Sequence, residues 1–487
     1  MKTFKKFYRE VLFWFENSTS RFRPLVYVTV VVSFFTSIFL FLSPYINQDY
    51  QKVQMISKAT ENKPNIILII VDALSAEDMS LFGYNIETTP KIEQFTQDWT
   101  IYSNAHSPSN CSVNIYPALI TGRYPGSFCQ NSRYGDKIRS SDEWINLFEL
   151  LDDVGYETWW TGYESPSFYH TGSGIDNIFA RPYDEVLQRT SFQVHSIRIK
   201  NFPYIPLGFF QMMHAFSGNG PAGEKLEVGK DLIAKQKMTP PFFLYLHYHG
   251  VHGIEYPSGD YLGSILPIEE GLIDAQSQDK YYGKYNLTDQ NMVDKLRLRY
   301  DEAILNQDGR LANLVDEIKS AGYYDSSMII IMGDHGQSFS NGFSSHCTTL
   351  MSYAETHVPL LIKYPFQDSG KVINSVVSTL DLTPTILEIA EIKYEKEWFD
   401  GELLPQINYN QNKNRYVFST RGCGLNYSTV INDQYKLTTR EDKIFLFDYV
   451  NDPQESNNLY LSMGEYDVIE KDAMEAYREF ERKIEGK

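Results

Sequence analysis

The chain has 487 residues, 42% of them hydrophobic and 22% charged, which is the composition of a folded protein with one large domain and a smaller one. The formal net charge of −18 argues against nucleic acid as a partner, because a phosphate backbone needs a basic face. It does not exclude a phosphorylated or sulfated substrate, since a bound cation can reverse the sign of the charge inside a site.

The first predicted element is an uncharged, apolar stretch over residues 25–45. At about 1.5 Å per residue it can cross a bilayer core of roughly 30 Å. Basic residues precede it and few follow, which places the N-terminus in the cytoplasm. We expect a cytoplasmic basic tail (1–24), a single transmembrane anchor (25–45) and a polar linker (46–64). No small-residue cleavage site follows, so a retained anchor is favoured over a removed signal peptide, and the rest of the chain is expected in the periplasm or outside the cell.

Strands and helices alternate after the linker. The pattern predicts strands over residues 65–71, 157–162, 242–249, 328–333 and 358–363. It predicts a helix that starts with a capping box at Ser140–Glu143 and runs to about Val154, and a longer helix over about 289–320. An amphipathic helix is expected from Glu465 onward. This alternation is typical of an α/β fold with a mostly parallel sheet covered by helices on both faces.

Two of these strands each run without interruption into an acid. Asn65–Val71 is followed by Asp72, and Met328–Gly333 by Asp334 and His335. An ionised carboxylate at the end of a buried strand is costly unless something pairs with it. Because ligands gather at the carboxyl ends of parallel strands, we expect both acids to face one cation. The sequence therefore predicts a metal-dependent enzyme.

The four cysteines are Cys111, Cys129, Cys347 and Cys423. Outside the cytoplasm they can form two disulfides in three different pairings, and their spacing matches no zinc motif.

Several motifs, taken in order, resemble the sulfatase and alkaline phosphatase superfamily. The likeness runs from about Asn65 to Leu459, through the segments Val71–Leu74, Phe82–Tyr84, Thr88–Pro90, Ser107–Pro125, Tyr300–Gly322, Gly333–Gly336, Val358–Leu361, Asp381–Thr385, Leu446–Asp448 and Asp452–Glu455. The resemblance implies an alkaline-phosphatase-like three-layer α/β sandwich. We expect a catalytic domain over 65–396 and a smaller C-terminal subdomain over 397–487.

The resemblance also implies the roles of particular residues. Counting back from Thr121-Gly122-Arg123 places Ser112 at the family's nucleophile position. Asp72, Asp334 and His335, with Ser112, are the ligands expected for one divalent ion, which can be Ca, Mg, Mn or Zn. His252 looks like the family's histidine that contacts the transferred group or the leaving oxygen. His346 is a second candidate for that role, and His247 or His249 could take the place of His252.

The nucleophile loop departs from the pattern C-x-P-S-R of true sulfatases, in which the first residue becomes formylglycine. The matching residues here are Ser112, Asn114, Ile115 and Tyr116, so the Pro and the Arg are both missing. Ala73 stands where many sulfatases have a second Asp. An unmodified hydroxyl with one metal resembles instead the envelope phosphotransferases of the superfamily, which use Thr at this position.

We therefore expect a membrane-anchored, metal-dependent enzyme of the cell envelope that cleaves or transfers a phosphate or sulfate ester on a glycan or lipid head group, with Ser112 as nucleophile. One alternative is a sulfuric ester hydrolase of the formylglycine type. Another is a non-catalytic glycan-binding protein that kept the fold, which Ala73, Asn114 and Tyr116 favour and the acids Asp72 and Asp334 oppose.

Overall fold

The computed structural model describes residues 63–128, 145–162, 177–178, 221–235, 237–252, 261–407, 415–422, 425–460 and 467–485. The predicted basic tail and anchor, and the linker up to residue 62, lie outside the described residues. Among the helices that are described, none combines the length and the apolar character needed to cross a membrane.

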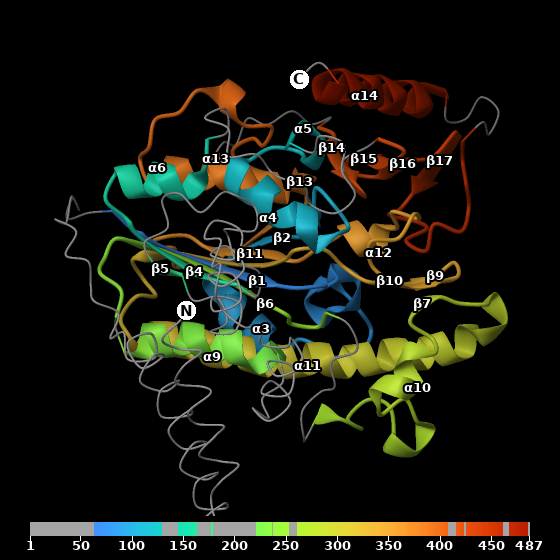
Figure 1. The fold of residues 1–487 in the computed structure, drawn as a ribbon, viewed down its shortest axis with the longest axis horizontal. Helices are drawn as coiled ribbons and strands as arrows, with labels where there is room; N and C mark the ends of the chain where they lie inside the picture. Colours follow the sequence, from blue (N-terminus) through green and yellow to red (C-terminus); the bar gives the residue numbers. More distant parts are fainter. Residues whose placement is uncertain are drawn as a thin grey trace, which may run out of the picture. The chain divides into compact units, whose positions relative to one another are not determined.

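A mixed sheet of eight described strands forms the centre of the fold (Figure 1). Its order is β12 (Lys371–Ile373), β2 (Thr100–Tyr102), β11 (Leu360–Lys363), β8 (Ser327–Gly333), β1 (Asn65–Val71), β6 (Phe242–Tyr248), β4 (Glu157–Thr161) and β5 (Asn177–Ile178). Within this sheet β11 pairs antiparallel with both neighbours, and the other pairings are parallel. The expected mostly parallel sheet is therefore present, with one strand reversed.

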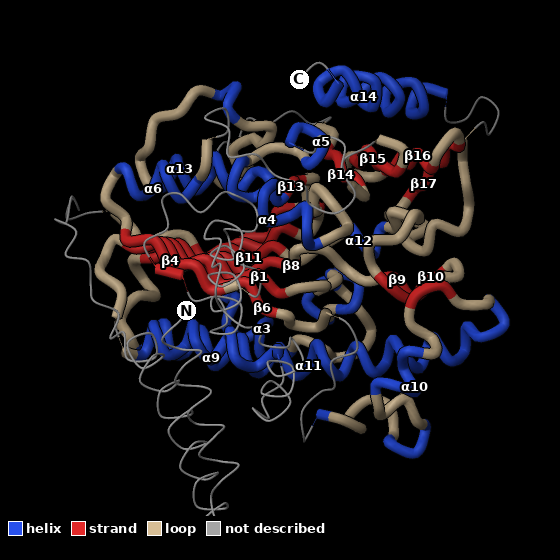
Figure 2. Tube along the Cα trace, in the orientation of Figure 1, coloured by secondary structure: helices blue, strands red, loops and turns tan. Residues whose placement is uncertain are grey.

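Helices cover both faces of this sheet, which makes three layers (Figure 2). One face carries α4 (Ser112–Thr121), α6 (Leu147–Asp153) and α13 (Leu382–Ile389); the other carries α3 (Pro90–Phe95), α9 (Pro221–Ala234) and α11 (Gln290–Ser320). Successive side chains of a strand point to opposite faces. In β1, Ile66, Leu68 and Ile70 accordingly pack into the first layer, and Ile67, Ile69 and Val71 into the second. Burial on both sides explains why the whole strand is apolar.

The predicted strands and the long helix are close to the observed ones, whereas the start of α6 is not. The helix begins at Leu147, and the side chain of Asn146 caps it by accepting from the N–H of Phe148. The expected capping box at Ser140–Glu143 lies outside the described residues, and the observed cap falls after it. An Asn at the N-cap accepts from an N–H of the first turn as well as a Ser does. The sequence alone therefore does not decide between a helix start at Ser140 and one at Asn146.

The C-terminal part contains a separate antiparallel sheet with the order β14 (Val417–Thr420), β15 (Tyr427–Ile431), β16 (Tyr435–Arg440) and β17 (Lys443–Asp448). Helix α14 (Asp467–Glu485) packs on it through Ala473 and Tyr477. A backbone bridge joins Ser109 to Thr420 at the end of β14. This small sheet therefore touches the loop that precedes α4.

Candidate active site

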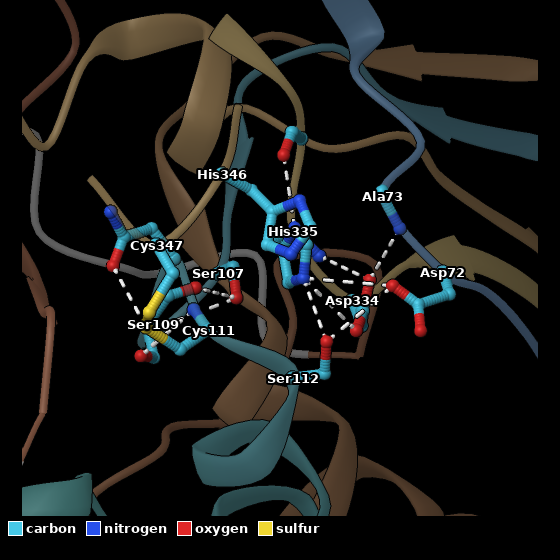
Figure 3. A network of polar contacts seen from close by, with 12 residues as sticks. Asp72, Ala73, Ser107, Ser109, Cys111, Ser112, Asp334, His335, His346 and Cys347 are labelled. Atoms are coloured by element: carbon cyan, nitrogen blue, oxygen red, sulfur yellow. Dashed lines mark hydrogen bonds and ion pairs between the residues drawn. A yellow bond between two sulfur atoms is a disulfide. The ribbon is translucent and has the colours of Figure 1, made fainter. Parts of the chain in front are cut away.

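The two predicted acids lie side by side at the carboxyl ends of β1 and β8. These strands are parallel neighbours with Val71 opposite Gly333, so Asp72 and Asp334 follow at the same edge. Both side chains are fully buried. One oxygen of Asp334, Oδ1, accepts the N–H of Ala73 at 2.9 Å and that of His335 at 2.7 Å (Figure 3). The backbone thus fixes the direction of the Asp334 carboxylate.

The second oxygen of Asp334 is the best indication of a cation. Oδ2 is buried and makes no hydrogen bond to any described residue. Its nearest basic atoms are Nε2 of His335 at 3.6 Å and Nε2 of His247 at 3.7 Å. A buried carboxylate oxygen that lacks a donor is costly, and a cation held between such oxygens and imidazoles removes that cost. The residues present therefore fit a divalent metal ion.

His335 presents one defined ring nitrogen to the site. Its Nδ1 lies 2.9 Å from the carbonyl oxygen of Gly336. A carbonyl only accepts, so Nδ1 carries the proton and Nε2 is left with a lone pair. Nε2 faces Oγ of Ser112 at 2.9 Å and Oδ1 of Asp72 at 3.6 Å. This is the tautomer that a metal-ligating histidine adopts.

Ser112, at the start of α4, lies next to the acid Asp72 and to His335. It is the first residue of α4, and its Oγ lies 3.5 Å from Oδ1 of Asp72. Cys111 at the N-cap position makes no side-chain hydrogen bond to this helix end. The first N–H groups of a helix point out of its N-terminus and favour an anion there. The structure places Ser112, Asp72, Asp334 and His335 together, and their roles as nucleophile and metal ligands stay predictions.

The two further predicted histidines lie next to this group. The ring of His346 stacks on that of His335 with centroids 4.5 Å apart, and His252 lies 4.7 Å from His346. Nδ1 of His346 contacts Oε1 of Gln337 at 3.1 Å. Burial lowers the pKa of His252, and burial with the nearby His335 ring lowers the pKa of His346 well below its usual range. The structure places both residues beside the acids, and their catalytic roles stay predictions.

His247 is the residue near the acids that sequence reasoning left as an alternative only. It lies opposite Ile70 of β1, and its Nε2 is 4.0 Å from Oδ2 of Asp72. Ligand atoms of Asp72, His247 and Asp334 all lie within 4.8 Å of one another. The sequence shows that His247 ends an apolar strand, as the two acids do, but it does not show that this strand is the neighbour of β1.

A disulfide between Cys111 and Cys347 borders the site (Figure 3). It joins the residue before Ser112 to the residue after His346, across 236 residues of sequence. The N–H of Cys347 donates to the carbonyl of Asn110 at 2.8 Å. The sequence left three pairings open, and the structure contains the Cys111–Cys347 disulfide. Cys129 and Cys423 lie outside the described residues.

Asn114 and Tyr116, two of the positions that differ from C-x-P-S-R, are buried in the protein interior. The side-chain amide of Asn114 donates to Oγ of Ser109 at 3.1 Å and to the carbonyl of Arg421 at 3.2 Å. Tyr116 stands where the pattern has Arg and packs edge-on against Trp160, with ring centroids 4.4 Å apart. No cation is therefore supplied from this position to residue 112.

Comparison with known proteins gives the family. The family model described as sulfatase matches residues 64–392, and the model of the C-terminal part of N-sulphoglucosamine sulphohydrolase matches residues 347–482. A sulfatase of Formosa agariphila is 25% identical, over 86% of this chain and 88% of that protein. Arylsulfatase K of Xenopus laevis is 27% identical, over 74% of this chain and 70% of that protein.

Solved structures agree on the fold. A phosphonate monoester hydrolase of Agrobacterium radiobacter is 15% identical, covers 87% of this chain and 96% of its own, and has a TM-score of 0.62. A 2-O GAG sulfatase is 19% identical, covers 87% and 93%, and has a TM-score of 0.61. With two thirds of its length matched by the family model and its buried acids at the expected strand ends, the chain belongs to the sulfatase family and is an enzyme of the ester-cleaving type.

Proposed function

We propose that this enzyme cleaves or transfers a phosphate or sulfate ester with the unmodified hydroxyl of Ser112 as nucleophile and with one divalent cation. The observation that carries the proposal is the position of Ser112 Oγ, 2.9 Å from His335 Nε2 and 3.5 Å from Asp72 Oδ1 at the start of α4. Two buried acids, an imidazole and a hydroxyl converge there, which is the group expected of an activated oxygen nucleophile.

The cation would be held by Asp72, Asp334, His335 and Ser112, with His247 in reach as a further ligand. When bound, it would lower the pKa of the serine hydroxyl and screen the charge that grows on the phosphoryl or sulfuryl oxygens. Two imidazoles beside two carboxylates suit Zn²⁺ or Mn²⁺ better than Ca²⁺ or Mg²⁺, which prefer oxygen alone.

The protein's own groups account for the remaining steps. The contact with His335 Nε2 fixes the position of the serine oxygen. This oxygen gives its proton to solvent water and forms a bond to phosphorus or sulfur. The N–H groups at the start of α4 donate toward the oxygens that gain charge. The bond to the ester oxygen breaks, and that oxygen leaves with a proton, for which His252 and His346 are the candidate donors. Water or a second hydroxyl then takes the group from Ser112.

The alternative is formylglycine chemistry at residue 112, as in sulfatases of the C-x-P-S-R type. The interior packing of Asn114 and Tyr116 supports the unmodified serine, because the loop lacks the proline and the arginine of that pattern. Cys111 does not supply a formylglycine either, since its sulfur is bonded to Cys347.

We propose a sulfated or phosphorylated glycan or lipid head group as the substrate, outside the cytoplasm and near a membrane. Names of similar proteins support the glycan: one relative is the human N-acetylgalactosamine-6-sulfatase, and one similar structure is described with a carrageenan-type hexaose. The apolar stretch over residues 25–45 supports the membrane location.

The test uses the full-length enzyme with 4-nitrophenyl phosphate and 4-nitrophenyl sulfate. Ser112→Ala should abolish turnover, while Ser112→Thr, which keeps a hydroxyl on the same carbon, should retain part of it. Chelation should remove the activity, and adding back Zn²⁺ or Mn²⁺ should restore it. Ser369→Ala, at an exposed serine far along the chain, is the matched control and should leave turnover unchanged.

Mass spectrometry of the peptide that contains residue 112 separates the chemistries. A phosphorylated or sulfated Ser112 trapped at low pH would support the proposal. An aldehyde at residue 112 in protein from the native host would replace it with the formylglycine mechanism. Full turnover by Ser112→Ala would contradict both.

A further inference from the structure

A second group of possible metal ligands lies on the loop that follows β6. Ligand atoms of Asp72, His249 and His252 all lie within 4.8 Å of one another. Asp72 is fully buried, and the two histidines are partly buried. The centroids of the two imidazole rings are 5.4 Å apart and the ring planes meet at 73°.

The backbone fixes this loop against Asp72 on both sides. The N–H of Asp72 donates to the carbonyl of Tyr248 at 3.1 Å, and the N–H of Val251 donates to the carbonyl of Asp72 at 3.2 Å. The N–H of His252 closes a tight turn by donating to the carbonyl of His249 at 2.7 Å. The loop that carries the two histidines is therefore held by backbone hydrogen bonds to Asp72, the residue whose carboxylate the histidines approach.

Gly250 makes this approach possible. Its φ is +54°, and a Cβ there would lie 2.3 Å from Cγ1 of Val71 and 3.1 Å from the backbone N and O of Asp72. The amide of Gln307, from α11, donates to the carbonyl of Gly250 at 3.0 Å. A side chain at residue 250 would push the loop away from β1. The loop therefore holds His249 and His252 close to Asp72 because residue 250 is a glycine.

The second group shares Asp72 with the first group and differs from it in the other two ligands. His247 lies in β6, whose last residue is Tyr248, whereas His249 and His252 lie in the loop that follows. His247 approaches Asp334, whereas the group with His249 and His252 contains no atom of Asp334. A carboxylate has two oxygens with about four lone pairs, so Asp72 can serve two cations at once.

We propose that Asp72, His249 and His252 hold a second divalent cation of the zinc type. Two imidazoles and one carboxylate are the three protein ligands of an open catalytic zinc site, which keeps a position for substrate or water. Bonds of about 2 Å require the three side chains to rotate inward from their present separation.

The second cation also deepens the proposed function, and this part rests on that function being correct. Two cations beside the nucleophile stabilise both the attacking and the leaving oxygen of an in-line displacement. A phosphate monoester carries more negative charge than a sulfate monoester, so the phosphate ester gains more from a second cation. In this arrangement His252 acts as a ligand, and the proton for the leaving oxygen comes from His346 or water.

The experiment counts metal ions in the full-length enzyme after loading with Zn²⁺ and gel filtration. The wild type should hold two ions per chain, and the variant His249→Gln/His252→Gln should hold one. Asp334→Asn, which alters only the first group, should also hold one, and Asp72→Asn should lose both. One ion in the wild type, or two in the double variant, would overturn the inference.

Cobalt provides a second readout that does not depend on turnover. Visible absorption of Co²⁺ bound to the second group should disappear in the single variant His252→Gln, which serves if the double variant does not fold. Ser112→Ala should keep the His249–His252 ion while losing turnover. If Ser112→Ala keeps its turnover, the proposed function fails, and the ion count still decides the second site.

Discussion

Replacing both Cys111 and Cys347 with serine should lower the free energy of unfolding by about 5 kcal/mol. The disulfide closes a chain segment of 236 residues, and the loop-closure relation for a segment of that length gives about 5 kcal/mol as an upper value. Both cysteines are changed together because a single change would leave one thiol free to pair elsewhere. The assay is urea unfolding followed by tryptophan fluorescence, without reductant.

The same variant should keep at least about a tenth of its turnover once it is folded. The N–H of Cys347 still donates to Asn110 O, the amide of Asn110 still donates to Thr348 O at 3.0 Å, and Nε of Arg421 still donates to the carbonyl of residue 347 at 2.8 Å. These bonds hold the Ser112 and His346 loops together, so the loss of kcat should stay below about tenfold, or 1.4 kcal/mol.

Two results would refute this reasoning. A loss of less than about 1 kcal/mol would mean that the bridge constrains the unfolded chain far less than loop closure requires. A complete loss of turnover in a folded variant would mean that the hydrogen bonds do not position the loops. Wild-type enzyme treated with a reductant is the comparison for the first result.

Three further changes test the packing around the site and the sheet. Gly336→Ala should destabilise by a few kcal/mol in urea unfolding, because its Cβ would lie 1.9 Å from the carbonyl oxygen of Ala354; an unchanged midpoint would refute the packing argument. Arg415→Met should cost about 3 kcal/mol, because Arg415 pairs through two bonds of 2.6 and 2.7 Å with the buried Asp381, and adding Asp381→Asn should recover part of the loss. Burial raises the pKa of Asp308 to about 6, so the folded protein binds this proton more tightly than the unfolded chain does. The free energy of unfolding should therefore fall through this group as the pH rises from 4 to 6, and Asp308→Asn should show a correspondingly different slope between those pH values.

The strands and the two acids were predictable because the signal is local. The apolar run of β1 and the run of β8 each identify a strand buried on two faces, and Asp72 and Asp334 follow directly. Parallel strands of a covered sheet then place both acids at one edge. The family resemblance added Ser112, which the residues alone would leave as one loop serine among several.

What depends on strand order or long-range pairing was not predictable. Whether His247 reaches Asp334 depends on β6 being the neighbour of β1, in the register that puts Ile70 opposite His247. The partner of Cys111 lies 236 residues away, and spacing does not choose between the three pairings. Likewise, the sequence does not show that Gly250 lies against Val71.

The bridge between Ser109 and Thr420 bears on how the enzyme is made. The loop before Ser112 contacts Cys347 through a disulfide, and its backbone contacts the strand that ends at Thr420. The ribosome synthesises this loop long before Cys347 and Thr420. A nascent chain therefore contains Ser112 before the residues that hold its loop in place have been made. We therefore expect ester cleavage to begin only after Thr420 has been made, and a product truncated before that residue to be inactive.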